Sequence, residues 1–244
     1  MSRDAKLKAI ALIGIRSGSQ GLKDKNIKYF CGKPLVYWII KTALNASNID
    51  RVFVSTDSEK YRDIAIDTGA EAPFLRPKSI SGDNSKEKDY ILHCLEWLQV
   101  NENYQPDIVS RLQATSPLQL PEDIDRSIQS LEDDPYATSS MVVSKAIQHP
   151  MKAMKMDGDN KYLIPYCLED ASLEIVNRQT LPVAYFRSNI ISSRCSYLLE
   201  TKKQIGERSL IIEIPSERSI DINNSLDFFI AEKVAEKLGI CSFN

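Results

Sequence analysis

Apolar and polar residues follow one another along the chain in blocks that alternate between strand-like and helix-like patterns. Residues 9–15 form an uninterrupted apolar run, which predicts a parallel strand buried on both faces. Pro34 then opens a segment whose apolar residues recur at helical spacing as far as residues 45–48. Residues 52–57 predict a second strand, and the helix after it ends at Gly69.

The same alternation continues to about residue 136. A short extended segment is expected over 72–75, and a helix after it carries Ile91, Cys94, Leu95 and Leu98 on one stripe. Residues 107–112 predict another strand, and Pro121 begins another helix. Strands that alternate with helices predict an α/β fold with a mostly parallel sheet, in which ligands bind at the carboxyl ends of the strands.

After residue 136 the pattern changes to short β-like pieces, at 139–143 and 190–191, and a strand-like run returns at 210–214. No linker separates a second domain, so we expect residues 1–244 to form a single domain with a protruding subregion over about 140–190. The last helix is expected to turn one apolar stripe toward the core, formed by Leu226, Phe229, Ile230, Val234 and Leu238.

Composition narrows the classes of partner. The 31 Lys and Arg against 33 Asp and Glu give a net charge of −2, so neither nucleic acid nor a membrane surface is expected as a partner. No apolar run reaches the length of a membrane span or a signal core, which favours a cytoplasmic protein. The cysteines are odd in number and scattered, so we expect free thiols rather than disulfides or a zinc site: Cys31, Cys94, Cys167, Cys195 and Cys241.

The segment 14–26 that follows the first strand combines small residues with Arg16, Lys23 and Lys25. Small residues let backbone N–H groups converge, and the basic residues add positive charge, so a triphosphate is the natural guest. The segment is neither a Walker loop nor a dinucleotide-binding fingerprint. The pattern alone is equally compatible with an ordinary tight turn.

Four further segments narrow the interpretation. They are Gly32-Lys33-Pro34-Leu35, Val54-Ser55-Thr56-Asp57, Leu112-Gln113-Ala114-Thr115-Ser116-Pro117-Leu118 and Ser219-Ile220-Asp221-Ile222-Asn223. Together with the loop 14–26, and in this order, they resemble the acylneuraminate cytidylyltransferases from about residue 9 to residue 238. The resemblance implies a Rossmann-like nucleotidyltransferase fold, with helices flanking the sheet and an irregular, β-rich dimerisation arm that protrudes and also helps bind the sugar. It further implies transfer of CMP from CTP to the anomeric hydroxyl of a sialic-acid-like 2-keto acid sugar, with Mg²⁺ or Mn²⁺ as cofactor and a homodimer as the assembly.

The resemblance also implies roles for single residues. Arg16 and Lys25 would hold the triphosphate as catalytic residues, and nucleotide binding falls to Ser17, Gly18, Ser19, Gln20, Gly21, Asn26, Arg76 and Asp83. Sugar binding falls to Gln113, Arg178 and Arg187, and metal binding to Asp221 and Asn223, which share a face as residues i and i+2 of an extended segment. Simpler structural roles compete with these: solvated surface charges, a loop-capping arginine, a glutamine in a turn, or arginines at a subunit contact.

The sequence departs from the family pattern at several positions. Gln20 stands where the family has Lys, and Asn223 replaces the second metal carboxylate. The segment 187–190 lacks the usual Pro and Gly, and the loop 81–87 follows the family only at Asp83. Two alternatives stay open: a nucleotide-binding homologue with weak or no activity, and a nucleotidyltransferase for another sugar or base. A cytidylyltransferase for an eight-carbon 2-keto acid is a third, disfavoured because residues 19–26 read Ser-Gln-Gly-Leu-Lys-Asp-Lys-Asn where that group has Ser-x-Arg-Leu-Pro-Gly-Lys.

Overall fold

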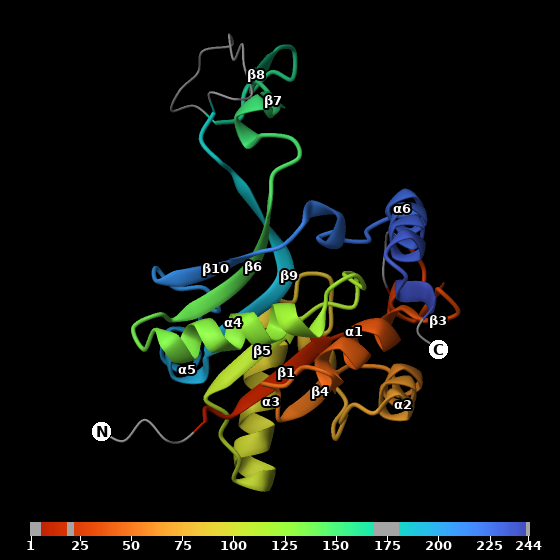
Figure 1. The fold of residues 1–244 in the computed structure, drawn as a ribbon, viewed down its shortest axis with the longest axis vertical. Coiled ribbons are helices and arrows are strands. Elements are labelled where there is room, and N and C mark those ends of the chain that lie inside the picture. Colours follow the sequence, from red (N-terminus) through yellow and green to blue (C-terminus); the bar gives the residue numbers. More distant parts are fainter. Residues whose placement is uncertain (1–5, 19–21, 168–180, 243–244) are drawn as a thin grey trace.

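The structure is a computed structural model that describes residues 6–18, 22–167 and 181–242. Six strands form one sheet in the order β10-β6-β9-β5-β1-β4 (Figure 1). β9 runs antiparallel to its neighbours β5 and β6, and the other strands run parallel to one another, which confirms the mostly parallel sheet. The strands are β1 (Ala9–Gly14), β4 (Arg51–Ser55), β5 (Ile108–Leu112), β6 (Ser139–Lys145), β9 (Tyr185–Arg194) and β10 (Ser209–Glu213).

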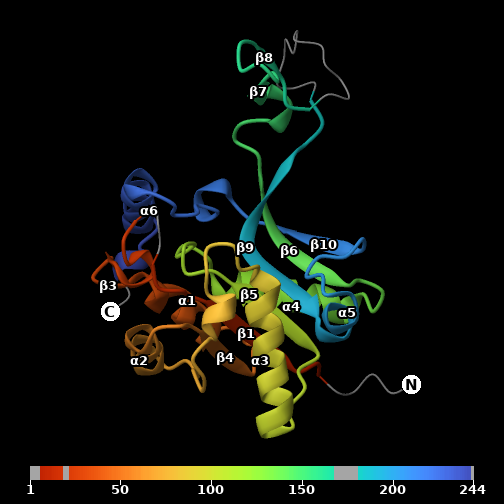
Figure 2. The same ribbon diagram turned by 180° about the vertical axis from the view of Figure 1, so that it is seen from behind.

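Helices cover both faces of this sheet. One apolar cluster joins the sheet to α1 (Leu35–Leu44), α2 (Glu59–Thr68) and α4 (Pro121–Asp133), and a second joins its other face to α3 (Glu87–Glu102) and α5 (Cys195–Thr201). Figure 1 has α1 and α4 in front of the sheet, and Figure 2 has α3 in front. Because alternate residues of β1 feed both clusters, every position of the strand is apolar or glycine, as its sequence predicted.

The apolar stripe expected to face the core on the last helix, α6 (Ser225–Lys237), is wrong. α6 buries Phe228, Ala231 and Ala235 against the hairpin of β2 (Tyr29–Phe30) and β3 (Lys33–Pro34) and the start of α1. The alanines allow the helix to approach closely, and this contact turns the larger apolar residues outward. The predicted stripe residues Leu226, Phe229, Ile230 and Leu238 are between 39% and 64% exposed, and only Val234 of that stripe packs partly inward.

The expectation that every cysteine is a free thiol is also wrong. Cys31, in the turn between β2 and β3, forms a disulfide with Cys241, in the 3-10 turn after α6, with their Cα atoms 5.1 Å apart. The two are separated by 210 residues, so no spacing in the sequence pairs them. The packing of α6 onto the hairpin brings them together. The other cysteines, Cys94, Cys167 and Cys195, are free as expected.

β6 and β9 form a long ribbon that leaves the sheet. It ends in a small hairpin of β7 (Met154–Met156) and β8 (Leu163–Pro165), which lies far from the α-helices that cover the sheet (Figure 1). We call residues 146–167 together with 181–184 the arm. Several apolar side chains on the arm are exposed: Ile147, Met154, Met156, Tyr162, Leu163, Tyr166 and Val183. Short 3-10 turns occupy Lys25–Ile27, Lys78–Ile80, Pro150–Lys152, Ser216–Arg218 and Ile240–Ser242. Among the described helices, none is long and apolar enough to cross a membrane.

Candidate active site

The loops that follow β1 and β5, at the carboxyl ends of these parallel strands, surround a cavity of about 180 Å³ together with the start of α3. Its lining residues are Gly14, Arg16, Asn26, Arg76, Ile80, Gly82, Ser85, Lys86, Glu87, Tyr90, Gln113, Ala114 and Thr115. A larger cavity, of about 780 Å³, lies between α3 and α5 at the amino ends of β1 and β5, near Asp107 and Cys195. None of the predicted site residues lines the larger cavity, so the smaller one is the candidate site.

The loop after β1 is anchored by Asp57, which follows β4. The backbone N–H and the hydroxyl of Ser17 each donate a 2.7 Å hydrogen bond to the Asp57 carboxylate. Partial burial would raise the pKa of Asp57, but these hydrogen bonds outweigh it and hold the pKa below its ordinary value. Ser17 therefore fixes the loop, and Gly18 continues it with a φ of 76°, which favours glycine. Ser19, Gln20 and Gly21 lie outside the described residues.

The predicted catalytic residue Arg16 forms an ion pair with the predicted nucleotide-binding residue Asp83. Arg16 Nη1 lies 2.6 Å from Asp83 Oδ1, and both side chains are partly exposed. Asn26 is almost fully buried behind them, and its amide donates to the carbonyl oxygen of Arg16 at 3.3 Å. Arg16 thus contacts two predicted nucleotide-binding residues, Asp83 through its side chain and Asn26 through its backbone carbonyl.

Arg76 forms the buried wall of the same cavity. Its guanidinium donates to Ser55 Oγ at 3.0 Å and lies 4.5 Å from the centre of the Tyr90 ring, and it is only 6% exposed. Gly14 also packs against this ring, since a Cβ on Gly14 would come within 2.5 Å of Tyr90 Cζ. Only glycine fits there, so the end of β1, Tyr90 and Arg76 form one closely packed layer.

Lys25 connects the loop to the predicted metal residues. Its Nζ donates to the carbonyl oxygen of Ile222 at 2.6 Å, between Asp221 and Asn223. Burial lowers the pKa of Lys25, and the charges of Asp221 and Asp227 oppose that shift. The two segments are almost 200 residues apart in sequence, and this contact brings the predicted triphosphate and metal residues to one place.

The Asp221 carboxylate accepts hydrogen bonds from two side-chain amides. Asn189 Nδ2 donates to its Oδ1 at 2.9 Å, and Asn223 Nδ2 donates to its Oδ2 at 3.0 Å. Asp227, one turn into α6, accepts the backbone N–H groups of Asn223 and Asn224 and so caps the helix. The predicted metal pair therefore offers one carboxylate and one amide. The described residues contain no cluster of three or more His, Cys, Asp or Glu side chains that could hold a metal ion.

The predicted sugar-binding residues are less closely grouped. Gln113 follows β5, lines the cavity and donates from Nε2 to Glu87 Oε1. Arg187 is exposed on the ribbon of β9, where it pairs with Val143 of β6. Arg178 lies outside the described residues. The structure thus places Gln113, but not Arg187, in the wall of the cavity.

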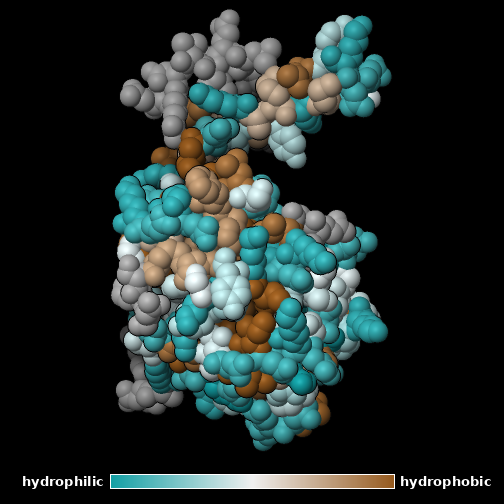
Figure 3. All heavy atoms as spheres, turned by 90° about the vertical axis from the view of Figure 1, so that its right-hand side faces the viewer, coloured by the Kyte–Doolittle hydropathy of each residue, from teal (hydrophilic) through white to brown (hydrophobic). Residues whose placement is uncertain are grey.

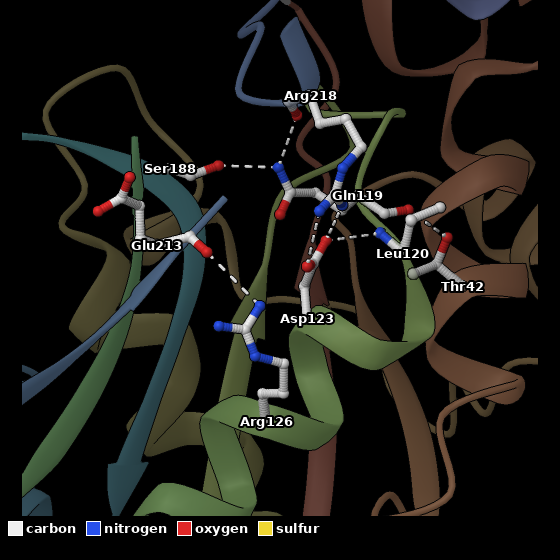
Figure 4. Close-up of polar contacts among 8 residues, drawn as sticks. All are labelled: Thr42, Gln119, Leu120, Asp123, Arg126, Ser188, Glu213 and Arg218. Atoms are coloured by element: carbon white, nitrogen blue, oxygen red, sulfur yellow. Dashed lines mark hydrogen bonds and ion pairs between the residues drawn. The ribbon is translucent and has the colours of Figure 1, made fainter. Parts of the chain in front are cut away.

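A buried polar network supports the segment that carries Asp221 (Figure 4). Arg218 forms an ion pair with Asp123, which is 2% exposed and also accepts the N–H of Leu120 at the start of α4. Gln119 Nε2 donates to Ser188 Oγ at 2.8 Å and to the carbonyl oxygen of Arg218 at 2.9 Å. The network therefore fastens the 215–222 segment to α4 and to β9.

Sequence patterns missed several of these residues. Six residues that hold site residues in place through hydrogen bonds or ion pairs were not predicted as site residues: Asp57, Glu87, Arg111, Asp123, Asn189 and Arg218. Asp123 carried a usable signal, since an acidic residue at the third position after a helix start caps helices. The pairings between distant segments have no local signature.

Comparisons with known proteins show what the chain as a whole is similar to. The sequence profile of the Cytidylyltransferase family matches residues 10–202. The chain is 29% identical to a CMP-N,N'-diacetyllegionaminic acid synthase of Legionella pneumophila over 94% of this chain and 97% of the relative. It is 30% identical to an N-acylneuraminate cytidylyltransferase of Escherichia coli over 94% of this chain, which spans about half (52%) of that longer protein.

A solved structure of a CMP:2-keto-3-deoxy-manno-octonic acid synthetase complexed with CTP superimposes with a TM-score of 0.70. It covers 95% of this chain and 99% of its own, at 16% sequence identity, so the likeness shows the fold. The expected Rossmann-like nucleotidyltransferase fold is thereby confirmed. The profile match spans most of the chain and includes the segments that line the cavity, and on this basis the chain belongs to the cytidylyltransferase family of nucleotidyltransferases.

Proposed function

We propose that this protein transfers CMP from CTP to the anomeric hydroxyl of a sialic-acid-like 2-keto acid sugar and releases pyrophosphate. The observation that carries the proposal is the convergence of Arg16, Asn26, Arg76 and Gln113 on one cavity. These residues come from three separate segments; Arg16 was predicted as a catalytic residue, Asn26 and Arg76 as nucleotide-binding residues and Gln113 as a sugar-binding residue. Both relatives named above carry names for this type of reaction.

In the proposed reaction the hydroxyl oxygen of the sugar attacks the α-phosphorus of CTP and loses its proton. The bond from that phosphorus to the bridging oxygen breaks, and pyrophosphate leaves. Such a transfer needs in-line positioning and stabilisation of negative charge more than covalent chemistry from the protein. Arg16 and Lys25 supply cations from the loop 14–26, and the phosphates of CTP take the place of Asp83 as the partner of Arg16.

Asp221 and Asn223 are the residues that we propose to hold Mg²⁺, with Mn²⁺ as an alternative ion. Their donor atoms are oxygens, which suit a hard cation, and Mg²⁺ commonly binds through one or two carboxylates together with substrate phosphates and water. One carboxylate and one amide therefore fit a Mg²⁺ site in which the phosphates of CTP and water supply the remaining ligands. When bound, the ion neutralises charge on the triphosphate, while Lys25 fixes the backbone between its two ligands.

We also propose that the protein works as a cytoplasmic homodimer and that the arm contributes to the subunit contact. Support comes from the exposed apolar side chains of the arm and from the exposed stripe of α6. Figure 3 looks onto the side that carries α6 and shows hydrophobic side chains at the surface there and along the base of the arm. Arg187 lies on the ribbon of β6 and β9 that leads to the arm, so it either binds the sugar or contributes to the subunit contact.

A thermal-shift titration with CTP, UTP, ATP and GTP, each with and without Mg²⁺, tests the nucleotide site. Selective stabilisation by CTP is expected. Pyrophosphate release is then measured with N-acetylneuraminic acid, N,N'-diacetyllegionaminic acid and 2-keto-3-deoxyoctonic acid. Arg16→Ala should abolish turnover, whereas Arg62→Ala, a control on α2 with the same 33% side-chain exposure, should not.

A second candidate function is nucleotide binding without efficient transfer. The observation that favours it is Asn223, which leaves the metal pair with a single carboxylate. It predicts stabilisation by CTP but no pyrophosphate release with either Mg²⁺ or Mn²⁺. Stabilisation by another nucleotide would instead indicate a nucleotidyltransferase for a different base, and turnover with the eight-carbon sugar alone would indicate that substrate.

A further inference from the structure

Glu87, the first residue of α3, contacts two side chains: Arg111, on β5, and Gln113, just after the strand. Its Oε1 accepts a hydrogen bond from Gln113 Nε2, and its Oε2 lies 3.5 Å from Nε of Arg111. Arg111 and Gln113 are two residues apart in extended chain, so both face α3. Glu87 and Gln113 line the candidate cavity, whereas Arg111 lies behind them.

The burial of Arg111 makes this arrangement costly. Its side chain is 5% exposed, and its Nε and Nη1 have no hydrogen-bond partner among the described residues. A buried guanidinium needs a partner of opposite charge, and Glu87 is the carboxylate that the described residues place in ion-pair contact with it. An apolar side chain at position 111 would fill the same space without this cost, so the pair calls for a reason beyond packing.

The pair dictates how Gln113 presents its amide. A carboxylate only accepts hydrogen bonds, so Glu87 can bind only the NH₂ end of the Gln113 amide. The carbonyl oxygen of that amide is then the end turned away from Glu87. A ligand in the cavity therefore meets a hydrogen-bond acceptor at this position.

We infer that Glu87 and Arg111 are positioning residues that hold Gln113 as an acceptor for a hydroxyl or N–H group of the sugar. The inference rests on the proposed function and specifies which end of the sugar Gln113 recognises: a donor group, not the carboxylate. Arg111 has a second task, because Glu87 is a half-exposed carboxylate in a site for two anionic substrates. The guanidinium behind it cancels a charge that would otherwise repel them.

Glu87→Gln tests the positioning role. With an amide at position 87, its oxygen turns to Arg111 and its NH₂ turns to Gln113, which must then rotate and present NH₂ to the ligand. We expect the KM for the sugar to rise about 5- to 30-fold, the effect of one unsatisfied hydrogen bond, while the CTP concentration for half-maximal thermal shift does not rise, because the remaining Arg111 charge favours an anionic nucleotide. A merely structural role would not separate these two readouts.

A series of monodeoxy sugars sharpens the test. In the wild type, the analogue that lacks the group bound by Gln113 should lose as much affinity as Glu87→Gln does with the complete sugar. In the variant, the same deletion should cost little, because the interaction is already absent.

Arg111→Met tests the charge role. It leaves Glu87 uncompensated, so the apparent affinities for both CTP and sugar should fall. In the double variant Glu87→Gln/Arg111→Met the charge is gone, and the affinity for CTP should return toward that of the wild type. Glu87→Gln leaves the buried Arg111 guanidinium without its counter-charge, so the Tm of each variant is measured first. If Glu87→Gln does not fold, the double variant, which buries no charge, repeats the measurement of the sugar KM.

Glu102→Gln is the matched control, because Glu102 ends the same helix and pairs with Arg51 far from the cavity. Its kinetics should match those of the wild type. Unchanged sugar KM in Glu87→Gln, or an equal loss for CTP and sugar, overturns the inference while leaving the proposed function intact. A wild type that transfers CMP to none of the three sugars overturns both.

Discussion

The buried pair of Asp123 and Arg218 allows a direct test of how the 215–222 segment, which carries Asp221, is held. Asp123→Asn removes the negative charge and keeps the shape of the side chain. In the structure the Asp123 carboxylate accepts from both Arg218 and the N–H of Leu120, and it is 2% exposed (Figure 4). The variant leaves the Arg218 guanidinium, 14% exposed, without its counter-charge.

Breaking a buried ion pair by removing one partner costs about 3–5 kcal/mol, because a charge stays buried and unpaired. The asparagine oxygen can still accept from Leu120, so we expect a loss near the lower end, about 3 kcal/mol. For a domain of this size each kcal/mol shifts the Tm by roughly 2–4 °C, so the Tm should fall by ~6–12 °C. The Mg²⁺ concentration needed for activity should rise as well, because Asp221 lies on the released segment.

Thermal unfolding followed by circular dichroism measures the first effect and a metal titration of turnover the second. Glu236→Gln is the control, since its pair with Lys233 is more than half exposed on both sides and should shift the Tm by less than about 2 °C. Asp123→Leu/Arg218→Met should recover most of the stability, because an apolar pair carries no desolvation cost. A Tm within 2 °C of the wild type in Asp123→Asn would refute the reasoning.

Three further predictions follow from other contacts. Cys241→Ser should lower stability by about 2–4 kcal/mol by opening the bond to Cys31, and a reductant should lower the Tm of the wild type but not of the variant; a wild-type Tm insensitive to reduction would contradict the bond. Asn223→Asp should lower the half-saturating Mg²⁺ concentration, and an unaltered titration would exclude Asn223 as a ligand. Asp57 has a lowered pKa in the folded state, so its hydrogen bonds from Ser17 stabilise the protein above about pH 4 and are lost as the pH falls through that lowered pKa. The Tm difference between wild type and Asp57→Asn should therefore narrow in acid.

Local patterns accounted for most of the elements. The apolar run of β1 predicted a strand buried on both faces because such a strand leaves no position for a polar side chain. α2 begins after the N-cap residue Ser58 and ends at Gly69, which adopts a left-handed conformation. Such start and stop signals involve only a few neighbouring residues. β9 was harder to foresee, because its antiparallel direction depends on how the chain returns from the arm.

The candidate site was predictable only as far as segments could be matched to a family. Four residues to which the resemblance gave catalytic, nucleotide-binding or sugar-binding roles line one cavity: Arg16, Asn26, Arg76 and Gln113. The residues that hold them in place were not predictable, because each depends on a partner from a distant segment. Asp57 shows this well: it stood in a quoted motif, yet its bond to Ser17, 40 residues away, appears only in three dimensions.

The error on α6 has a physical cause that bears on the assembly. The helix has two apolar faces, one with Phe228, Ala231 and Ala235 and one with larger side chains, and helical periodicity cannot say which of them meets the core. Transfer energy favours burying the larger face, but the alanine face fits the hairpin more closely. The larger face then remains as an exposed apolar stripe formed by Leu226, Phe229, Ile230 and Leu238. Exposed apolar surface of this kind is typical of contacts with other chains, so the mispredicted face supports the homodimer that we propose.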